Sequence, residues 1–422
     1  MATARGTNAG VGIVRISGPR SLEIVGHLTR HCEVLNEPRQ SSFNLKPRHA
    51  HFVTLKLADI TDTAIVVFFP APKSFTGEDV VEIQAHGGEL LLQKIVDAAI
   101  THGARLAEPG EFTRRAIENG KMTLTDAEGL LGIINAECDA ELAAASVLKG
   151  GELGTKMMEV ESGLVDISAQ IEAALDHPED VTLDKSIFKR LRAFMETLDT
   201  FVENGKTTAY IFRGINVAIL GEPNAGKSSL FNKLIGLDRS IVTEIAGTTT
   251  DCVSETITFA GFKIRLVDTA GIRDAAGGKI EKLGIERTIK AARDCDIALV
   301  FDTTGAKLAK ELNKPIINVT RTSTPDKIKA EIIRLTVGDA RISSRPIASV
   351  RQLNELNAAH EALKFCLTGG TVTSIDNTSA DREPDLVASG IQTALHHIGR
   401  ITGTNSTEAV LDAIFSKFCL GK

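Results

Sequence analysis

An eight-residue segment near the middle of the chain has the composition of a phosphate-binding loop. Residues 221–228 read Gly-Glu-Pro-Asn-Ala-Gly-Lys-Ser and fit the pattern G-x-x-x-x-G-K-[ST]. Glycines let the backbone curl until several N–H groups point at phosphate oxygens, and the N-terminus of a following helix favours an anion. Lys227 would then reach the β- and γ-phosphates of a nucleotide, and the Ser228 hydroxyl would bind Mg²⁺. The alternative is a glycine-rich turn without a ligand, which the strand before this segment and the helix after it disfavour.

Two further motifs downstream belong to the same kind of site. Residues 267–271 read Val-Asp-Thr-Ala-Gly at the end of a second strand. There Asp268 can hold Mg²⁺ through water, and the Gly271 N–H can sense the γ-phosphate. Between the two motifs, residues 247–251 read Gly-Thr-Thr-Thr-Asp, and a Thr here can ligate Mg²⁺ when a triphosphate is bound. The order and strand context of the three motifs predict a GTP-binding protein of the P-loop class.

The elements that must position these motifs alternate between strand and helix. Such alternation predicts a mainly parallel sheet covered on both faces. Helical stretches lie on both sides of this α/β region, so we expect it to be an insertion, with the two helical halves packing together. The first part of the chain instead mixes strands and turns with one helix. The expected strands are Val11–Ile16, Ala64–Phe69, Val80–Ile83, Asn216–Leu220, Lys263–Val267, Ile297–Phe301 and Pro315–Val319, and the expected helices are Glu89–Ala99, Asp126–Leu148, Glu159–Leu175, Lys189–Val202, Lys227–Leu234, Lys282–Ala292, Arg351–Leu367 and Asp385–Thr402.

The composition excludes several classes of protein. The six cysteines are scattered without a C-x-x-C pair, which argues against a zinc site or a secreted disulfide framework and for a reducing compartment. A formal charge of −6 and the absence of Trp argue against general binding of a phosphate backbone and against base stacking, so any RNA contact needs local basic patches. No apolar run approaches the roughly 20 residues of a membrane span, and the N-terminus lacks the apolar core of a signal peptide. We expect a cytoplasmic protein that does not bind a membrane.

Four segments outside the nucleotide motifs carry a more specific signal. They read G-V-G-I-V-R-I-S-G at 10–18, S-F-T-G-E-D-V-V-E-I-Q at 74–84, P-G-E-F-T-R-R-A at 109–116, and F-C-L-G-K at 418–422. With the P-loop, they make the chain resemble the tRNA modification GTPase family MnmE, also called TrmE, over nearly its whole length.

The resemblance implies a fold that combines α/β and all-α parts. Residues 1–118 would form a front α/β domain that binds tetrahydrofolate and dimerises. Residues 119–210 and 347–422 would form the two parts of a helical domain. Residues 211–346 would form an inserted Ras-like P-loop GTPase domain.

The resemblance also implies partners and one-carbon chemistry. Members of this family act as homodimers with an FAD-dependent partner, MnmG (GidA), to install an aminomethyl-type or carboxymethylaminomethyl group at C5 of the wobble uridine of certain tRNAs. Folate, as 5,10-methylenetetrahydrofolate or 5-formyltetrahydrofolate, supplies the carbon. By position, Arg15, Glu82, Lys121 and Lys422 match the family's folate contacts, and Cys419 is a candidate for a role near the one-carbon group. Taken alone, each charge would be interpreted as a solvated group or a structural ion pair, and Cys419 as a small buried apolar residue.

In the nucleotide domain the resemblance assigns further roles. Glu281 matches the glutamate that orients the attacking water, although by itself it is one acid in a charged helix start. A bound K⁺ could supply the positive charge that an arginine finger supplies elsewhere. Its expected ligands are Asn224, Thr243, Ile245 and Thr248, and those of Mg²⁺ are Ser228 and Thr249. The residues expected to contact GTP are Asn224, Ala225, Gly226, Lys227, Ser228, Ser229, Thr243, Glu244, Ile245, Ala246, Gly247, Thr248, Thr249, Asp268, Thr269, Ala270 and Gly271.

The chain departs from the family pattern where guanine should be recognised. The motif N-K-x-D should follow the strand Pro315–Val319, but residues 320–323 read Thr-Arg-Thr-Ser. The carboxylate that would accept the guanine N1–H and N2–H₂ is therefore missing, at a cost on the order of 1–3 kcal/mol. The later base loop is arguably kept at 343–345, but the expected last GTPase helix is missing because residues 347–356 already resemble the returning helical domain. Thr250 stands where the family usually has Arg.

Three interpretations follow. The first is a cytoplasmic GTPase that modifies tRNA. The second is a folate-binding scaffold of the same complex whose degenerate nucleotide domain no longer cycles. The residues at 320–323 favour it, whereas intact Lys227, Ser228, Asp268 and Glu281 oppose it. The third, a GTPase switch in ribosome assembly, is disfavoured by the front and C-terminal segments.

Overall fold

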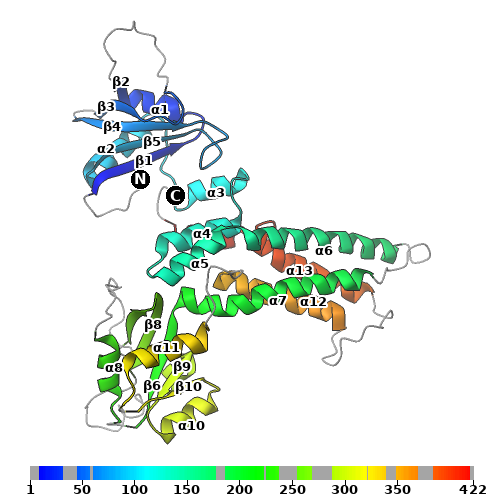
Figure 1. Cartoon of the computed structure of the whole chain (residues 1–422). Coiled ribbons are helices and arrows are strands. Elements are labelled where there is room, and N and C mark those ends of the chain that lie inside the picture. Colours follow the sequence, from blue (N-terminus) through cyan, green and yellow to red (C-terminus); the bar gives the residue numbers. More distant parts are fainter. Residues whose placement is uncertain are drawn as a thin grey trace, which may run out of the picture. The chain divides into compact units, whose positions relative to one another are not determined.

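The computed structural model describes residues 9–31, 45–57, 60–176, 186–222, 225–236, 254–268, 288–320, 322–338, 348–368 and 384–418 (Figure 1). The chain forms two compact units. The first consists of Met1–Ala127 with Thr402–Lys422, and the second of Glu128–Ile401. No helix among the described residues is long and apolar enough to cross a membrane.

The first unit is built on an antiparallel sheet with the strand order β1-β5-β4-β3-β2. Its strands are β1 (Ala9–Ser17), β2 (Thr29–His31), β3 (His51–Leu57), β4 (Ile60–Phe69) and β5 (Val80–Gly87). Side chains alternate along each strand, so that one face buries residues such as Val14, Val66 and Ile83 against helices α1 (Ser21–Leu28) and α2 (Glu89–Thr101). On the opposite face Phe52 and Ile65 are 61% and 39% exposed. This alternation confirms the strand pattern expected for the front of the chain.

The end of the chain returns to the first unit. Helix α14 (Glu408–Phe415) packs on α3 (Glu111–Glu118). Gly110, which precedes α3, has φ = 70°, and a Cβ there would come within 2.8 Å of the Cβ of Phe415. A larger residue would force the two helices apart, so glycine is needed for this close approach. Arg114 of α3 also donates a hydrogen bond of 2.9 Å to Glu408.

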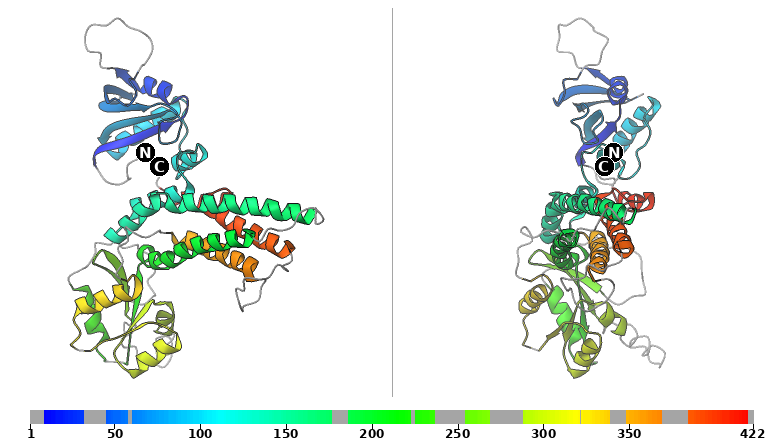
Figure 2. Two further views of the ribbon diagram at one scale, coloured as in Figure 1. Left: turned by 45° about the vertical axis from the view of Figure 1, so that its right-hand side comes forward. Right: turned by 90° about the vertical axis from the view of Figure 1, so that its right-hand side faces the viewer.

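In the second unit, long helices form a bundle. Helices α6, α7, α12 and α13 run side by side around a core that includes Leu164, Leu191, Leu363 and Ile398 (Figures 1 and 2). Because α12 contributes to this core, the chain after the α/β region does return to the helical part, as expected. The helices are α5 (Asp139–Lys149), α6 (Glu152–Asp176), α7 (Ser186–Arg213), α12 (Val350–Thr368) and α13 (Pro384–Thr402), preceded by α4 (Leu124–Asn135), which begins in the first unit.

One expected helix is in fact two. The prediction of a single helix over Asp126–Leu148 is wrong, because α4 ends at Asn135 and α5 begins at Asp139. Between them Cys138 is extended (φ −147°, ψ 163°). The new helix start is stabilised because the Glu141 carboxylate accepts the Glu137 N–H at 2.7 Å and the Gly261 carbonyl accepts the Ala140 N–H at 3.0 Å. The helix break leaves the Glu137 and Ala140 N–H groups without the bonds that they would make in a continuous helix, and these two contacts replace those bonds.

The second unit also contains a five-stranded sheet with the order β10-β9-β6-β8-β7. All its pairings are parallel except that of β7 with β8. One face packs on α8 and α11, and the other on α10 and residue Ala292, which confirms the expected parallel sheet covered on both faces. Residues 282–287 of the expected helix Lys282–Ala292 lie outside the described part of the chain. The elements are β6 (Ile215–Leu220), α8 (Lys227–Ile235), β7 (Ser254–Phe259), β8 (Phe262–Asp268), β9 (Ile297–Val300), α10 (Thr303–Glu311), β10 (Ile316–Asn318) and α11 (Pro325–Thr336).

Candidate functional site

The loop between β6 and α8 requires glycine at both ends. β6 is a buried central strand that ends at Leu220, and the next residue, Gly221, has φ = 156°. A Cβ at Gly221 would lie 2.8 Å from a carboxylate oxygen of Asp302, so the loop passes too close to its neighbour for a side chain. At the other end Gly226 precedes α8 with φ = 100°, which favours glycine strongly. The first turn of α8 presents backbone N–H groups that have no acceptor within the helix.

Lys227 is the first residue of α8 and folds back over this loop. Its side chain is buried, with the residue only 7% exposed. The Nζ atom donates hydrogen bonds of 2.8 Å to the carbonyl oxygens of both Gly221 and Glu222. These contacts hold an ammonium charge at the helix N-terminus, where the helix dipole already favours an anion. A buried lysine that holds its charge over the loop at the helix N-terminus suits a phosphate group.

Asp302 fixes the start of the loop and was not among the residues expected from the sequence. It follows β9 and caps α10, since its Oδ1 accepts the Gly305 N–H at 2.8 Å. Its Oδ2 accepts the Glu222 N–H at 2.5 Å. Burial raises the pKa of Asp302, but the two backbone N–H groups and the charge of Lys227 outweigh it and hold this pKa below its ordinary value. An acid directly after a buried strand and three residues before Gly305 was the signal that could have found this cap.

The parallel sheet brings other expected residues to the same edge. Ala225 to Ser229 lie in the loop and the first turn of α8. Asp268 ends β8, opposite Ile219 of β6, so its backbone lies beside the loop. The remaining expected contacts, which are Asn224, Thr243, Glu244, Ile245, Ala246, Gly247, Thr248, Thr249, Thr269, Ala270, Gly271, Glu281, Cys419 and Lys422, lie outside the described residues, as do residues 343–345.

In the first unit, three of the four segments that carry the family resemblance lie in contact with one another. They are the end of β1, the loop at 74–79 and the start of α3. Ser17 of β1 lies 2.7 Å from the Thr76 hydroxyl and donates a hydrogen bond of 2.9 Å to Glu78. Glu78 in turn accepts a bond of 2.8 Å from Arg115 of α3. Segments that are separated by dozens of residues in the sequence thus form one polar network.

Arg15 and Glu82 lie directly opposite each other on β1 and β5. The Arg15 guanidinium donates two hydrogen bonds, of 2.6 and 2.9 Å, to one Glu82 oxygen, and the side chains are 18% and 15% exposed. The guanidinium also lies 5.9 Å from the centre of the Phe75 ring. Lys121 is close to the same loop, because a Cβ on Gly77 would lie 3.1 Å from its Cε. The structure therefore places Arg15 and Lys121 beside the loop at 74–79 and pairs Glu82 with Arg15.

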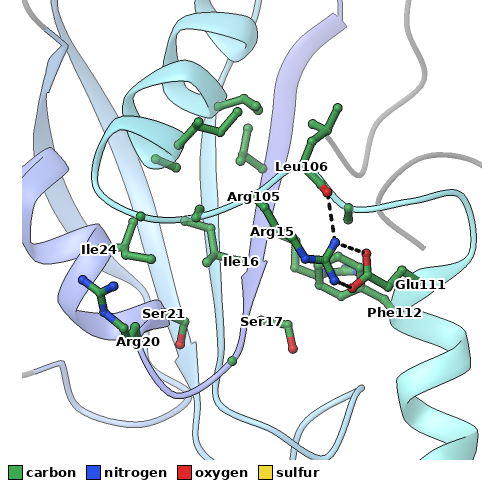
Figure 3. A pocket seen from close by; sticks show the side chains of 18 of the residues that line it. Arg15, Ile16, Ser17, Arg20, Ser21, Ile24, Arg105, Leu106, Glu111 and Phe112 are labelled. Carbon is green, nitrogen blue, oxygen red and sulfur yellow. Dashed lines mark hydrogen bonds and ion pairs between the residues drawn. The ribbon is translucent and has the colours of Figure 1, made fainter.

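A pocket of about 320 Å³ opens beside the network. Figure 3 shows Glu111 of α3 facing Arg105 at its edge, with Ser17, Ile24 and Phe112 among the lining residues. Burial would raise the pKa of Glu111, but hydrogen bonds from Arg105, the Glu108 N–H and Arg115 lower this pKa to about 2. The carboxylate is thus charged at all physiological pH values and joins the loop at 102–110 to α3. Arg15 lines this pocket, whereas Glu82 and Lys121 do not.

A buried parallel strand, a loop bounded by glycines and a helix that begins with a buried lysine define a P-loop nucleotide-binding protein. Comparisons with known proteins extend this result to the whole chain. Residues 1–121 match the family described as GTP-binding protein TrmE N-terminus, and residues 124–419 match the MnmE helical domain family.

Two full-length relatives agree with these matches. The tRNA modification GTPase MnmE of Akkermansia muciniphila is 38% identical over 449 residues, which cover 100% of this chain and 98% of that protein. The tRNA modification GTPase MnmE of Thermotoga maritima is 33% identical over 457 residues, which cover 100% of this chain and 99% of that protein. The chain belongs to the MnmE (TrmE) family of tRNA modification GTPases.

Among solved structures, the crystal structure of Era in complex with MgGDPNP and nucleotides 1506–1542 of 16S ribosomal RNA is 26% identical to this chain. It covers 32% of this chain and 49% of its own chain, with a TM-score of 0.19. A likeness of this size supports no conclusion about function.

Proposed function

We propose that this protein hydrolyses GTP in the cytoplasm as part of tRNA modification, together with a flavoprotein partner of the MnmG type and a tetrahydrofolate one-carbon donor. The observation that carries the proposal is the buried Lys227 over a glycine-bounded loop in a chain that matches tRNA modification GTPases over its full length. The product would be a wobble uridine carrying an aminomethyl-type or carboxymethylaminomethyl group at C5. The proposed domains are those expected from the sequence, 1–118, 119–210, 211–346 and 347–422.

The residues of the loop would do most of the work of hydrolysis. Lys227 and the N–H groups of the first turn of α8 would hold the phosphates and balance the charge that develops on them. Ser228 and Thr249 would hold Mg²⁺, and Asn224, Thr243, Ile245 and Thr248 would hold K⁺. These cations supply positive charge to the phosphates when they are bound. Glu281 would orient the attacking water.

The exposed face of the front sheet supports a folate-binding homodimer. Arg15, Glu82 and Val67 form one row across β1, β5 and β4, and Ile13, Gln84 and Ile65 form the next. Ile65 is 39% exposed, and Phe52, its neighbour on β3, is 61% exposed. A face with apolar side chains beside a charged pair suits contact with both a second subunit and a polar aromatic ligand.

The contact between Arg15 and Glu82 refines how folate would bind. Because the Arg15 Nη2 and Glu82 Oε1 atoms are 2.6 Å apart, both side chains would contact the same end of a folate. One could not bind the pterin while the other bound the glutamate tail. A pterin presents N–H donors and a carbonyl acceptor side by side, which suits a carboxylate next to a guanidinium. The anionic glutamate tail is then left to Lys121 and Lys422.

Phosphate release tests the enzymatic part of the proposal. The full-length protein with GTP, Mg²⁺ and K⁺ should release phosphate, and Ser228→Ala should reduce the rate by at least about tenfold, or 1.4 kcal/mol. Asn232→Ala, one turn later on α8 and exposed, is the matched control and should keep the wild-type rate. A wild-type rate in Ser228→Ala would remove this hydroxyl from the site.

Equilibrium dialysis tests the folate part separately. The wild-type dimer should bind 5-formyltetrahydrofolate saturably, and Arg15→Ala should bind at least about tenfold more weakly. Lys94→Ala, on the exposed side of α2, should not change the affinity. No saturable binding by a folded dimer would contradict the folate assignment and the one-carbon chemistry with it.

A second candidate function is a folate-binding scaffold whose nucleotide domain does not cycle. The observation that favours it is the turn after β10, where hydroxyl groups stand in place of the carboxylate that reads guanine. Folate binding without phosphate release would support this candidate over the first.

A further inference from the structure

The turn after β10 lies on the same edge of the sheet as the P-loop. β10 pairs in parallel with β9, and β9 pairs in parallel with β6. The carboxyl ends of parallel strands meet at one edge, which is where α/β sheets bind their ligands. The loop leaves β6 at Gly221, Asp302 leaves β9, and Thr320 follows β10. The bond from the Glu222 N–H to Asp302 shows that neighbouring strand ends are in direct contact here.

This turn is lined by hydroxyl groups. The Ser323 Oγ accepts the Thr320 N–H at 3.0 Å and lies 3.1 Å from the Thr320 Oγ1. The Thr320 Oγ1 is also 2.9 Å from the Thr322 Oγ1. Thr320 and Thr322 are exposed and Ser323 is half-buried, so the cluster faces outward from the end of β10. The turn itself contributes no carboxylate.

Hydroxyl and carboxylate groups select bases differently. A carboxylate only accepts hydrogen bonds, so it favours guanine, which presents N1–H and N2–H₂, and it repels the N1 lone pair of adenine. A hydroxyl can either donate or accept. It can therefore accept the N1–H of guanine or hypoxanthine, or donate to the N1 of adenine, without leaving a charge unpaired.

We propose that this chain binds purine nucleoside triphosphates with relaxed base choice, and that Ser323 is the specificity-determining residue. The site is the nucleotide site proposed above, so the relaxed choice depends on Lys227 binding a triphosphate at all. ATP and ITP enter the same site as GTP. The phosphate contacts provide most of the affinity, and the base end adds little discrimination.

Asp326 supplies the carboxylate nearest in sequence after Ser323, and a contact between it and guanine would contradict the relaxed base choice. It lies in the first turn of α11, three residues beyond Ser323, and is exposed. If the turn rearranged on binding, this carboxylate could take the place of the missing one and restore a preference for guanine. The experiment therefore includes a variant of it.

Calorimetric titration of the full-length protein with GTP, ATP and ITP, each with Mg²⁺, tests the relaxed choice. We expect the three dissociation constants to agree within about tenfold. Ser323→Asp should raise the preference for GTP over ATP by at least about tenfold. Ser323→Asn, which introduces a side chain of nearly the size of Asp but without its charge, should not.

The outcomes separate the two proposals. A wild-type preference for GTP over ATP of about a thousandfold, or roughly 4 kcal/mol, would overturn the relaxed choice and leave the nucleotide site intact. Loss of that preference in Asp326→Asn would then assign the reading of guanine to Asp326. An equal rise in Ser323→Asp and Ser323→Asn would overturn the role of charge at this position. No binding of any of the three triphosphates would overturn the nucleotide site itself and the relaxed choice with it.

Discussion

Glu111→Gln should destabilise α3 at neutral pH and have little effect near pH 2. The Glu111 carboxylate is 12% exposed and accepts hydrogen bonds from Arg105 at 2.9 Å, from the Glu108 N–H at 2.9 Å and from Arg115 at 2.6 Å. Gln keeps the size and one oxygen acceptor but loses the charge that these three groups stabilise. The substitution therefore weakens the hydrogen bonds of Arg105, Arg115 and the Glu108 N–H to this side chain without leaving a cavity.

The structure sets the size of this effect. The lowering of the Glu111 pKa from 4.5 to about 2 corresponds to at most about 3.5 kcal/mol of stability, at about 1.4 kcal/mol for each pKa unit. Arg105 is 65% exposed, so solvent screens part of its attraction. We expect a loss of about 1–2 kcal/mol at pH 7. Because the pKa is lower in the folded state, this stability is fully present above pH 4.5 and disappears as the pH falls towards 2.

Hydrogen exchange is the appropriate assay. The chain has no Trp, and its single Tyr, Tyr210, lies in α7 of the second unit, so intrinsic fluorescence does not report on α3. Exchange of the α3 amides, read by mass spectrometry, gives the free energy of local opening directly. Glu108→Gln is the matched control, since it changes an exposed neighbouring side chain and keeps the backbone N–H that contacts Glu111. We expect the control to stay within about 0.5 kcal/mol of wild type.

Two results would refute this reasoning. One is unchanged protection of α3 in Glu111→Gln at pH 7. The other is a loss that stays constant between pH 7 and pH 3, because a pH-independent loss would reflect packing and not the charge of the carboxylate.

Three further predictions concern the second unit. GTP hydrolysis should be at least about tenfold faster in K⁺ than in Na⁺ at matched ionic strength, and equal rates would remove the monovalent cation from the mechanism. Glu281→Ala should lower kcat by about a hundredfold or more and leave nucleotide affinity nearly unchanged, because a group that orients water acts mainly in the transition state; an equal drop in affinity measured by titration would make Glu281 structural. Lys263→Met should cost about 3 kcal/mol of stability at pH 7, since it leaves Glu141, which is 4% exposed and pairs with the Lys263 Nζ at 2.5 Å, without its partner charge. Denaturant unfolding followed by the fluorescence of Tyr210 measures that cost, and a change below about 0.5 kcal/mol would show that solvent compensates for the lost positive charge.

Local patterns predicted the strand before the loop at 221–226 and the helix after it. The strand Asn216–Leu220, the glycine-bounded loop and the helix at Lys227 need only short-range information, and they form as expected. The charged pair at Arg15 and Glu82 is different, because their contact depends on the register of β1 against β5, which no local pattern reveals. The docking of α14 on α3 likewise depends on a tertiary contact between Phe415 and Gly110.

Other features were visible in the sequence and were missed. Within β3 (His51–Leu57), residues 53–57 alternate apolar and polar side chains, so their period of two was a usable signal. The break between α4 and α5 was harder to find, since Ala and Glu are common in that stretch and propensity alone favours a continuous helix. The contact of Ala140 with Gly261 of the β7–β8 turn, which is distant in sequence, overrides that propensity.

Calorimetric titration of GTP and GDP with Mg²⁺ into wild type and Lys227→Ala tests the central claim most directly. Lys233→Ala, an exposed lysine on the same helix, is the control. If Lys227 holds the phosphates, wild type and Lys233→Ala should bind both nucleotides, and Lys227→Ala should bind at least about a hundredfold more weakly, or 2.8 kcal/mol. Equal affinity in Lys227→Ala and wild type would contradict the assignment of this loop as the nucleotide site.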